Sequence, residues 1–233
     1  NRDRKTYDNS FFANESLAYG YSGIQQYSSS YDKKTADFIV IEGPMAGGHL
    51  GFHKEQIGEL TPEIYAEEVK EIITVVRKYE EKYEKKIPVI LAGGIYEHTD
   101  YERAFTLGAD GVQIATRFVT TEECDADERY KQAYIQAKKE DIVIVNSPVG
   151  MPGRAIRNVF LDKVKAEGRI PPTKCLRCIH TCNPAETPYC ITEALIHAAK
   201  GEVDQALLFC GGRAYEAKTI ETVKKVIDYF CKD

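Results

Sequence analysis

Three short apolar segments constrain the fold of this chain most strongly. Residues 38–41, 87–91 and 111–115 are rich in β-branched and other apolar side chains, and we expect a buried strand at each, the first one buried on both faces. Between the first two, residues 62–86 carry apolar side chains on one helical face and charges on the other. Residues 99–107 form a second expected helix, so the order strand, helix, strand, helix, strand predicts a parallel α/β architecture with right-handed crossovers.

Local signals mark where the expected helices begin and end. Thr61 followed by Pro62 is an N-cap with proline at the first helical position. Thr99 with Glu102 three residues later fits a capping box, and Gly108 is a typical helix stop. The apolar face of the first helix is expected to comprise Ile64, Ile72, Val75, Val76 and Tyr79. Further along, we expect a helix over 125–138, a short apolar run at 142–145 and a largely helical tail over 188–232.

Composition limits the classes of function. The chain has 233 residues, 43% of them hydrophobic, and a formal charge of -5, which argues against a nucleic-acid groove or an anionic membrane surface. No apolar run approaches the roughly 20 residues of a membrane helix. Seven cysteines are an odd number, and four of them crowd into residues 175–190, so we expect a reducing, cytoplasmic setting. Residues 1–35 show no sustained period and are expected to form an irregular polar arm.

Glycines and a few polar side chains follow each expected strand. In parallel α/β folds, working residues gather at these carboxyl ends, and peptide N–H groups of glycines bind a phosphate without a side-chain charge. The pattern is compatible with simple tight turns, but two such ends one helix apart favour a phosphate cradle. The candidate residues are Gly47, Gly48, Gly93, Gly94, Gln113, Ala115 and Thr116.

His49 stands among glycines after the first expected strand. Small neighbours let a flat ligand approach the backbone and leave the imidazole available as an acid or base near neutral pH. A loop-capping role is the alternative for such a histidine. The setting favours function for His49, whereas His53 is expected on a surface loop and His98 at a helix start.

Several of these stretches together resemble the nitronate monooxygenase family, once called 2-nitropropane dioxygenases, and the related flavin-type enoyl-acyl-carrier-protein reductases. The resemblance lies in IEGPMAGGHLGF, IPVILAGGI and LGADGVQIATRFVTTEECDA, continues through SPVGMPGRAIRNVFLDKVKA, and covers about residues 36–232. It implies an FMN-binding TIM barrel with a helical lid, and His49 as the catalytic histidine beside the flavin. The amides of Gly93 and Gly94 are implied to hold the FMN phosphate, with Ala115–Thr116 standing where the family usually has Gly-Thr. Gly47, Gly48 and Gln113 are implied as flavin neighbours.

The resemblance covers only part of such a barrel. The three expected strands resemble the last three of eight, and a closed TIM barrel takes about 250 residues. We therefore expect an incomplete barrel over 36–150 with the flavin site, followed by a helical lid or tail over 151–233. Completing the barrel would need a missing N-terminal half, a second chain or self-association, because an open sheet edge leaves backbone groups unpaired.

Four cysteines in the tail follow the spacing C-x2-C-x3-C-x7-C. Thiolates so spaced can converge on zinc or an iron–sulfur cluster, although only the first pair matches common ligand spacing. Free cysteines also act as small apolar packing residues, which is what we expect of Cys124, Cys210 and Cys231. The candidate metal ligands are Cys175, Cys178, Cys182 and Cys190.

Two classes of function remain open from the sequence. The first is an FMN-dependent oxidoreductase acting on a small molecule, either a nitroalkane or nitronate with oxygen, or an enoyl thioester with NAD(P)H. Arg154 and Arg157 follow a Pro/Gly-rich turn and could approach a ligand from the lid, or could simply start a helix. The second class is a non-catalytic partial barrel that serves assembly, and a redox-sensing metal tail is a further alternative.

Overall fold

A parallel three-stranded sheet forms one half of the molecule. The computed structural model describes residues 35–180 and 182–232, so the predicted polar arm lies almost wholly outside the described residues. The sheet has the order β1-β3-β4, with β1 at Ile39–Glu42, β3 at Val89–Ala92 and β4 at Gly111–Gln113. Ile41 pairs in parallel with Leu91, and Leu91 with Val112. The predicted parallel α/β architecture is therefore confirmed for this half of the molecule.

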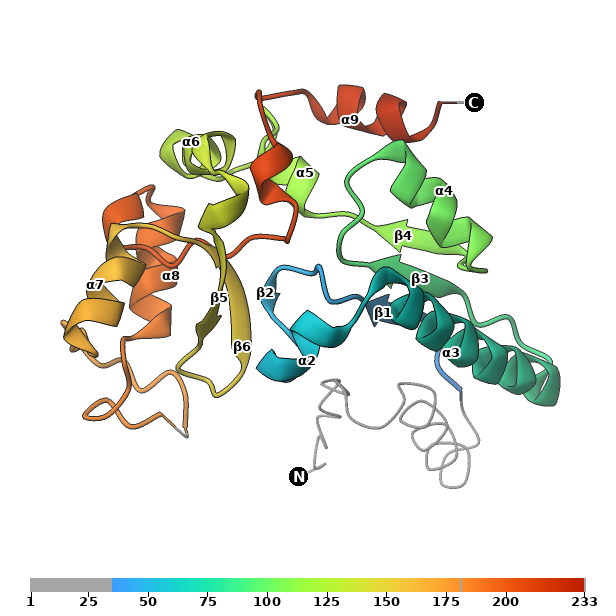
Figure 1. The fold of residues 1–233 in the computed structure, drawn as a ribbon, viewed down its shortest axis with the longest axis horizontal. Helices are drawn as coiled ribbons and strands as arrows, with labels where there is room; N and C mark the ends of the chain where they lie inside the picture. Colours follow the sequence, from blue (N-terminus) through green and yellow to red (C-terminus); the bar gives the residue numbers. More distant parts are fainter. Residues whose placement is uncertain (1–34, 181, 233) are drawn as a thin grey trace, which may run out of the picture.

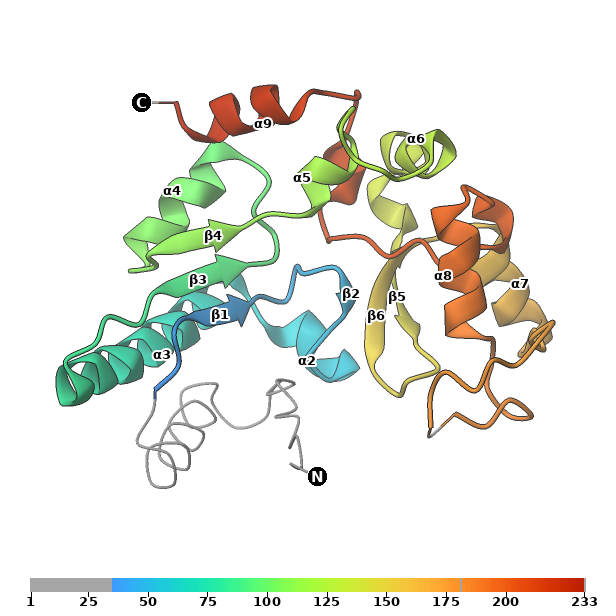
Figure 2. The ribbon, with the colours of Figure 1, turned by 180° about the vertical axis from the view of Figure 1, so that it is seen from behind.

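Two crossover helices cover one face of this sheet (Figures 1 and 2). Helix α3, Pro62–Tyr83, joins β1 to β3, and its N-cap is Thr61, whose side chain accepts a hydrogen bond from the Ile64 N–H, as predicted. Its buried face comprises Val69, Ile72, Ile73 and Val76. Ile64, expected on the apolar face, lies in the first turn of α3 and is 48% exposed.

Helix α4, His98–Thr106, joins β3 to β4 and begins one residue before the predicted start. Thr99 therefore lies inside the helix rather than at the cap. The Asp100 carboxylate instead accepts hydrogen bonds from the N–H groups of Tyr96 and Glu97, which satisfies two donors at the helix start. His98 at the helix start and Gly108 just beyond its end agree with the sequence analysis.

The other face of β1 is open, contrary to the prediction of burial on both faces. Ile41 packs into the core beneath α3, but Phe38 and Val40 are 59% and 41% exposed. Alternate residues of a strand point to opposite faces, so Phe38 and Val40 share the face away from α3. No other described element covers that surface.

An antiparallel sheet forms the other half of the molecule and was not predicted. Its order is β2-β6-β5, with β2 at Gly48–His49, β6 at Pro152–Ile156 and β5 at Ile142–Asn146. The predicted apolar run at 142–145 is thus strand β5, whereas β6 lies within the segment expected to be helical. Helices α7, Val159–Glu167, and α8, Ile191–Ala199, lie beside this sheet (Figure 1) and share a buried cluster with Ala155.

Short helices connect the two sheets. The expected helix over 125–138 is α6, at Glu128–Gln136. The tail carries less helix than predicted, because an irregular segment with two 3-10 turns separates α8 from α9, at Val223–Phe230. In the described part of the chain, no helix is long and apolar enough to cross a membrane. The remaining elements are α2 (Lys54–Glu59), α5 (Thr116–Val119), α6 (Glu128–Gln136), α9 (Val223–Phe230), η1 (Lys139–Asp141), η2 (Val203–Gln205) and η3 (Ala214–Glu216).

Candidate functional site

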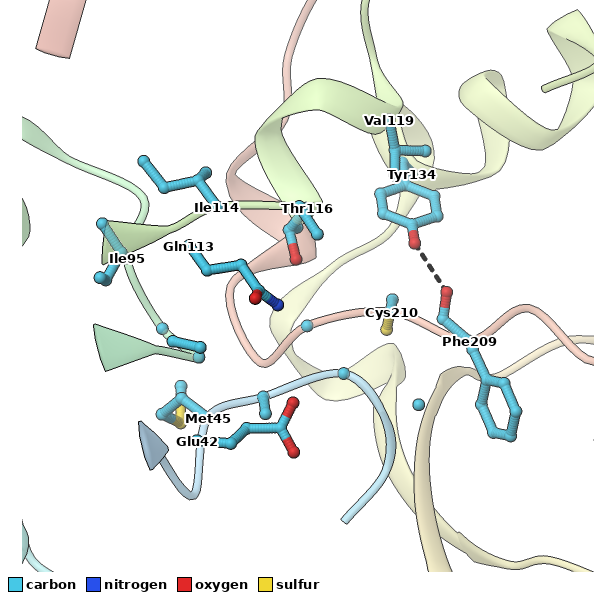
Figure 3. A pocket seen from close by; sticks show the side chains of 18 of the residues that line it. Glu42, Met45, Ile95, Gln113, Ile114, Thr116, Val119, Tyr134, Phe209 and Cys210 are labelled. Atoms are coloured by element: carbon cyan, nitrogen blue, oxygen red, sulfur yellow. Dashed lines mark hydrogen bonds between the residues drawn. The ribbon is translucent and has the colours of Figure 1, made fainter. Parts of the chain in front are cut away.

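A cavity of about 380 Å³ lies at the carboxyl ends of the parallel strands (Figure 3). This volume falls within the range of roughly 300–1,000 Å³ that is usual for small-molecule and cofactor sites. Its walls come from the ends of all three strands, from α5 and α6, and from a segment of the tail. The lining residues are Glu42, Met45, Ala46, Gly47, Gly48, Ala92, Gly93, Gly94, Ile95, Gln113, Ile114, Ala115, Thr116, Val119, Tyr130, Tyr134, Phe209, Cys210 and Gly211.

All seven residues predicted to bind a cofactor line this one cavity. The parallel register explains the gathering, because Glu42, Ala92 and Gln113 pair side by side and the segments after them leave the sheet at the same edge. Figure 3 shows Gln113 and Glu42 directed into the cavity from opposite sides, with the Thr116 hydroxyl nearby. The predicted cofactor residues therefore lie around a single cavity.

Gly93 has a backbone that only glycine adopts readily. Its φ is +83°, and a Cβ built there would lie 2.9 Å from the Cβ of Ala46 and 3.0 Å from the carbonyl oxygen of Gly43. The missing side chain lets the β1–β2 segment pack directly on the end of β3. Gly47 meets a similar limit, since a Cβ there would come within 2.6 Å of the Cys210 backbone.

His49 lies beside the cavity rather than in its lining. Its Nε2 is 2.7 Å from the Ser147 hydroxyl oxygen, and its ring packs edge-on against Phe209, with the ring centroids 4.9 Å apart. Phe209 itself lines the cavity. Strand β2 holds the histidine there, because Gly48 pairs with Arg154 and His49 with Gly153 on β6.

Burial shifts the pKa values of the two titratable groups nearest the strand ends in opposite directions. Desolvation lowers the pKa of the His49 imidazole, which favours the neutral ring at pH 7. Desolvation raises the pKa of the Glu42 carboxyl, and the described residues offer that side chain no hydrogen bond or ion pair. A neutral imidazole can accept a proton, so the site has a group suited to base chemistry.

Two tyrosines hold the tail segment that closes the cavity. The hydroxyls of Tyr130 and Tyr134 both donate to the Phe209 carbonyl oxygen, at 3.0 and 2.6 Å. Cys210, the next residue, is buried, and burial raises the pKa of its thiol to about 12. The sequence analysis expected Cys210 to be a packing residue and did not place residues 209–211 in the cavity wall. The glycines that follow Cys210 were the only local sign of a close contact there.

The two arginines considered as ligand contacts have structural partners. Arg154 is 5% exposed and its guanidinium donates to the Ala46 carbonyl, which ties β6 to the cavity wall without lining it. Arg157 is on the surface and pairs with Asp162 at 2.8 Å. Cys231, expected as a packing residue, is exposed.

The four clustered cysteines are all unpaired and stand apart from this cavity. In the described residues, no group of three or more histidine, cysteine or acidic side chains is placed closely enough to hold a metal ion. The cysteines do line a second hollow, of about 690 Å³, next to α8.

The residues of the main cavity fit a phosphate-bearing cofactor. Gly93 and Gly94 both line the cavity at the end of β3, and the peptide N–H groups of such glycines can bind an anion without a side-chain charge. Gly93 presents backbone rather than a side chain at this wall, and the Thr116 side chain lines the same cavity. Loops after the last strands of (β/α)8 barrels frequently form such phosphate sites.

Fold and site together define an α/β protein with a small-molecule site at the carboxyl ends of parallel strands, and comparison with known proteins specifies the family. Residues 20–233 match the nitronate monooxygenase family. A probable nitronate monooxygenase of Staphylococcus saprophyticus is 36% identical over 128 residues, which are 55% of this chain and 34% of that protein. The chain belongs to the nitronate monooxygenase family, a family of oxidoreductases.

Solved structures show the same fold. FabK from Thermotoga maritima is similar with a TM-score of 0.64 and 26% identity, covering 89% of this chain and 57% of FabK. A nitroalkane oxidase from Streptomyces ansochromogenes has a TM-score of 0.60 at 20% identity, covering 88% of this chain and 54% of that one. The chain thus spans about a third of its curated relative and little more than half of these structures.

Proposed function

We propose that this chain carries the cofactor site of an FMN-dependent oxidoreductase that oxidises nitroalkanes or their nitronates with oxygen. The observation that carries the proposal is the gathering of all seven predicted cofactor residues around one cavity, with His49 packed against its wall. Membership of the nitronate monooxygenase family supports the choice of substrate.

In this proposal the strand ends bind the cofactor. The amides of Gly93 and Gly94 hold the phosphate of FMN from one side, and Ala115 with Thr116 holds it from the other. Gly47, Gly48 and Gln113 lie beside the flavin, where the two glycines leave room for a flat ring. Bound FMN supplies the electron acceptor and the reaction with oxygen.

His49 serves as the base that takes the proton from the carbon next to the nitro group. In the described residues Ser147 is the hydrogen-bond partner of the ring, at Nε2, so Nδ1 is the nitrogen left to accept that proton. This tautomer requires Nε2–H to donate to the Ser147 oxygen. The lowered pKa supports the role, because an imidazole that is neutral at pH 7 is ready to act as a base.

We also propose that further βα units complete this site in a TIM-barrel arrangement, supplied by a longer polypeptide, a second copy or another chain. In the described residues β1 and β4 each pair on one side only, and Phe38 and Val40 expose apolar surface on the face away from α3. The native mass of the assembly tests this, and a monomer of this chain alone that turns over substrate contradicts it. The unpaired cysteines support a reducing, cytoplasmic setting.

The function is tested by cofactor content and by product. Protein purified by gel filtration should retain FMN and release nitrite from a primary nitroalkane or its nitronate. His49→Ala should retain FMN and lose turnover, whereas the control His53→Asn should match wild type, because His53 lies on the surface before α2. A colourless preparation that takes up no added FMN contradicts the enzyme. NAD(P)H oxidation with an enoyl thioester, without nitrite release from nitronates, contradicts the substrate.

A further inference from the structure

A long segment without helix or strand separates α7 from α8. We call residues 169–190 the cysteine loop. The structure describes all of it except residue 181, and it connects the end of α7 to the start of α8 (Figure 1). Ordered loops longer than about 12–15 residues without secondary structure are uncommon and usually have a function or need a local staple. The cysteine loop therefore requires an explanation of what holds it.

Hydrogen bonds close the loop at its base, and farther along it the Cys178 sulfur contacts the Thr192 hydroxyl of α8 at 3.0 Å. The Ile170 N–H donates to the Pro188 carbonyl at 2.7 Å, and Arg169 donates to the Pro184 carbonyl, also at 2.7 Å. Between these anchors the apolar packing is thin, since Leu176 is 60% exposed and Cys175 and Cys178 are exposed. A thin apolar contact through Ile179 joins the middle of the loop to the buried cluster beside α7 and α8.

The loop instead surrounds a hollow with thiols. Cys175, Cys178, Cys182 and Cys190 all line the cavity of about 690 Å³, together with His180. None of the four is in a disulfide. Four free thiols facing one space form an unusual concentration of soft ligands in a single short segment.

The turn between the first two cysteines has an unusual backbone and a contact to sulfur. Arg177 adopts a left-handed backbone with φ of +51°, which is uncommon for a residue other than glycine. Its N–H donates to the Cys175 sulfur at 3.4 Å. The turn thus brings a backbone donor to one cysteine sulfur, and both cysteines of the C-x2-C pair line the same hollow.

The hollow also lies next to the residue that hydrogen-bonds His49. Pro148, in the turn between β5 and β6, lines the hollow, and its neighbour Ser147 holds His49. Lys174 and Arg177 add positive charge next to the thiols, which offsets part of the negative charge of a thiolate-rich centre. The loop is thus placed where its order bears on the main site.

We propose that Cys175, Cys178, Cys182 and Cys190 bind a thiolate-ligated metal centre, either Zn²⁺ or an iron–sulfur cluster, which organises the cysteine loop. Since no three potential ligands converge in the described residues, the loop contracts around the metal as it binds. Preformed thiolate sites are rare without their metal, and binding then contributes directly to local folding. This inference does not depend on the proposed flavin chemistry.

Metal analysis of the full chain tests the proposal. Protein is produced with iron and zinc supplied and purified without oxygen, and zinc, iron and acid-labile sulfide are measured. We expect about one zinc, or about four irons with about four sulfides, per chain. The double variant Cys175→Ser/Cys178→Ser should contain at least tenfold less metal per chain than the wild type. Cys231→Ser, at an exposed position outside the loop, should contain as much metal as the wild type.

A measurement on unmodified protein guards against misfolded variants. In the native wild-type chain about four fewer thiols should react with a thiol reagent than after metal is removed by a chelator. Metal below about one tenth of an equivalent, or equal metal in the double variant and wild type, overturns the proposal. A non-reduced mass lower by about 2 Da for each cysteine pair, without metal, overturns it in favour of disulfides.

Discussion

Replacing Gly93 by alanine tests whether the end of β3 is built for close contact with the β1–β2 segment. The new methyl group brings two penalties. A left-handed backbone costs an alanine about 1–2 kcal/mol. The Cβ also lies 2.9 Å from the Ala46 Cβ and 3.0 Å from the Gly43 carbonyl oxygen, so the neighbouring backbone must shift, which costs about 1–3 kcal/mol more.

Gly150→Ala is the matched control for this substitution. Gly150 has φ of +85°, but a Cβ added there would meet no heavy atom within 4 Å, and the residue lies outside the main cavity. It therefore carries the backbone penalty alone. Urea unfolding should show a loss of about 2–5 kcal/mol for Gly93→Ala and about 1–2 kcal/mol for Gly150→Ala.

The same pair of variants should differ in cofactor affinity. Because Ala46 and Gly93 both line the cavity, the shift in Gly93→Ala moves the amides proposed to hold the phosphate. We expect FMN binding, followed by flavin fluorescence, to weaken at least tenfold in this variant, or about 1.4 kcal/mol, and to change little in Gly150→Ala. Equal stability and equal FMN affinity in the two variants would refute the reasoning.

Three further predictions follow from single contacts. Because burial lowers the pKa of His49, kcat/KM for a nitroalkane should be level at neutral pH and fall with acidification, and an acid midpoint above about 6.5 contradicts a buried base. Tyr130→Phe and Tyr134→Phe should each lower the free energy of unfolding by about 0.5–1.5 kcal/mol. The double variant should lose more than the sum of the two, because only then does the shared Phe209 carbonyl lose both tyrosine donors; additive losses in urea unfolding argue against this coupling. Thr61→Ala removes the cap of α3 and should lower unfolding free energy by about 0.5–2 kcal/mol, measured in the same way; an unchanged midpoint means that the cap contributes nothing.

Local patterns in the sequence were sufficient for the parallel half of the fold. Short apolar runs and an amphipathic helix of period 3.6 identify their own elements, so β1, α3, β3 and β4 could be placed without any tertiary information. The candidate site followed from them, because the carboxyl ends of neighbouring parallel strands must meet at one edge. That rule brought Gly93, Gln113 and their neighbours to one cavity.

Contacts between distant parts of the chain could not be predicted in this way. Ser147 lies 98 positions from His49, and no local period links them. Strand β2 has two residues and β6 contains proline and glycine, so neither shows the alternation that marks a strand. The exposed face of β1 was missed for a related reason, since an apolar run reveals that a strand can be buried but not which neighbours are present to bury it.

The amino-acid sequence by itself determined where the strands end and that glycines and a histidine stand there, because backbone preference and hydrophobic period act between near neighbours. Tertiary structure alone decided that Phe209 lines the cavity beside His49 and that Ser147 hydrogen-bonds the imidazole. Such contacts depend on how whole elements pack, and packing follows the summed shape of many side chains rather than any one stretch of the chain.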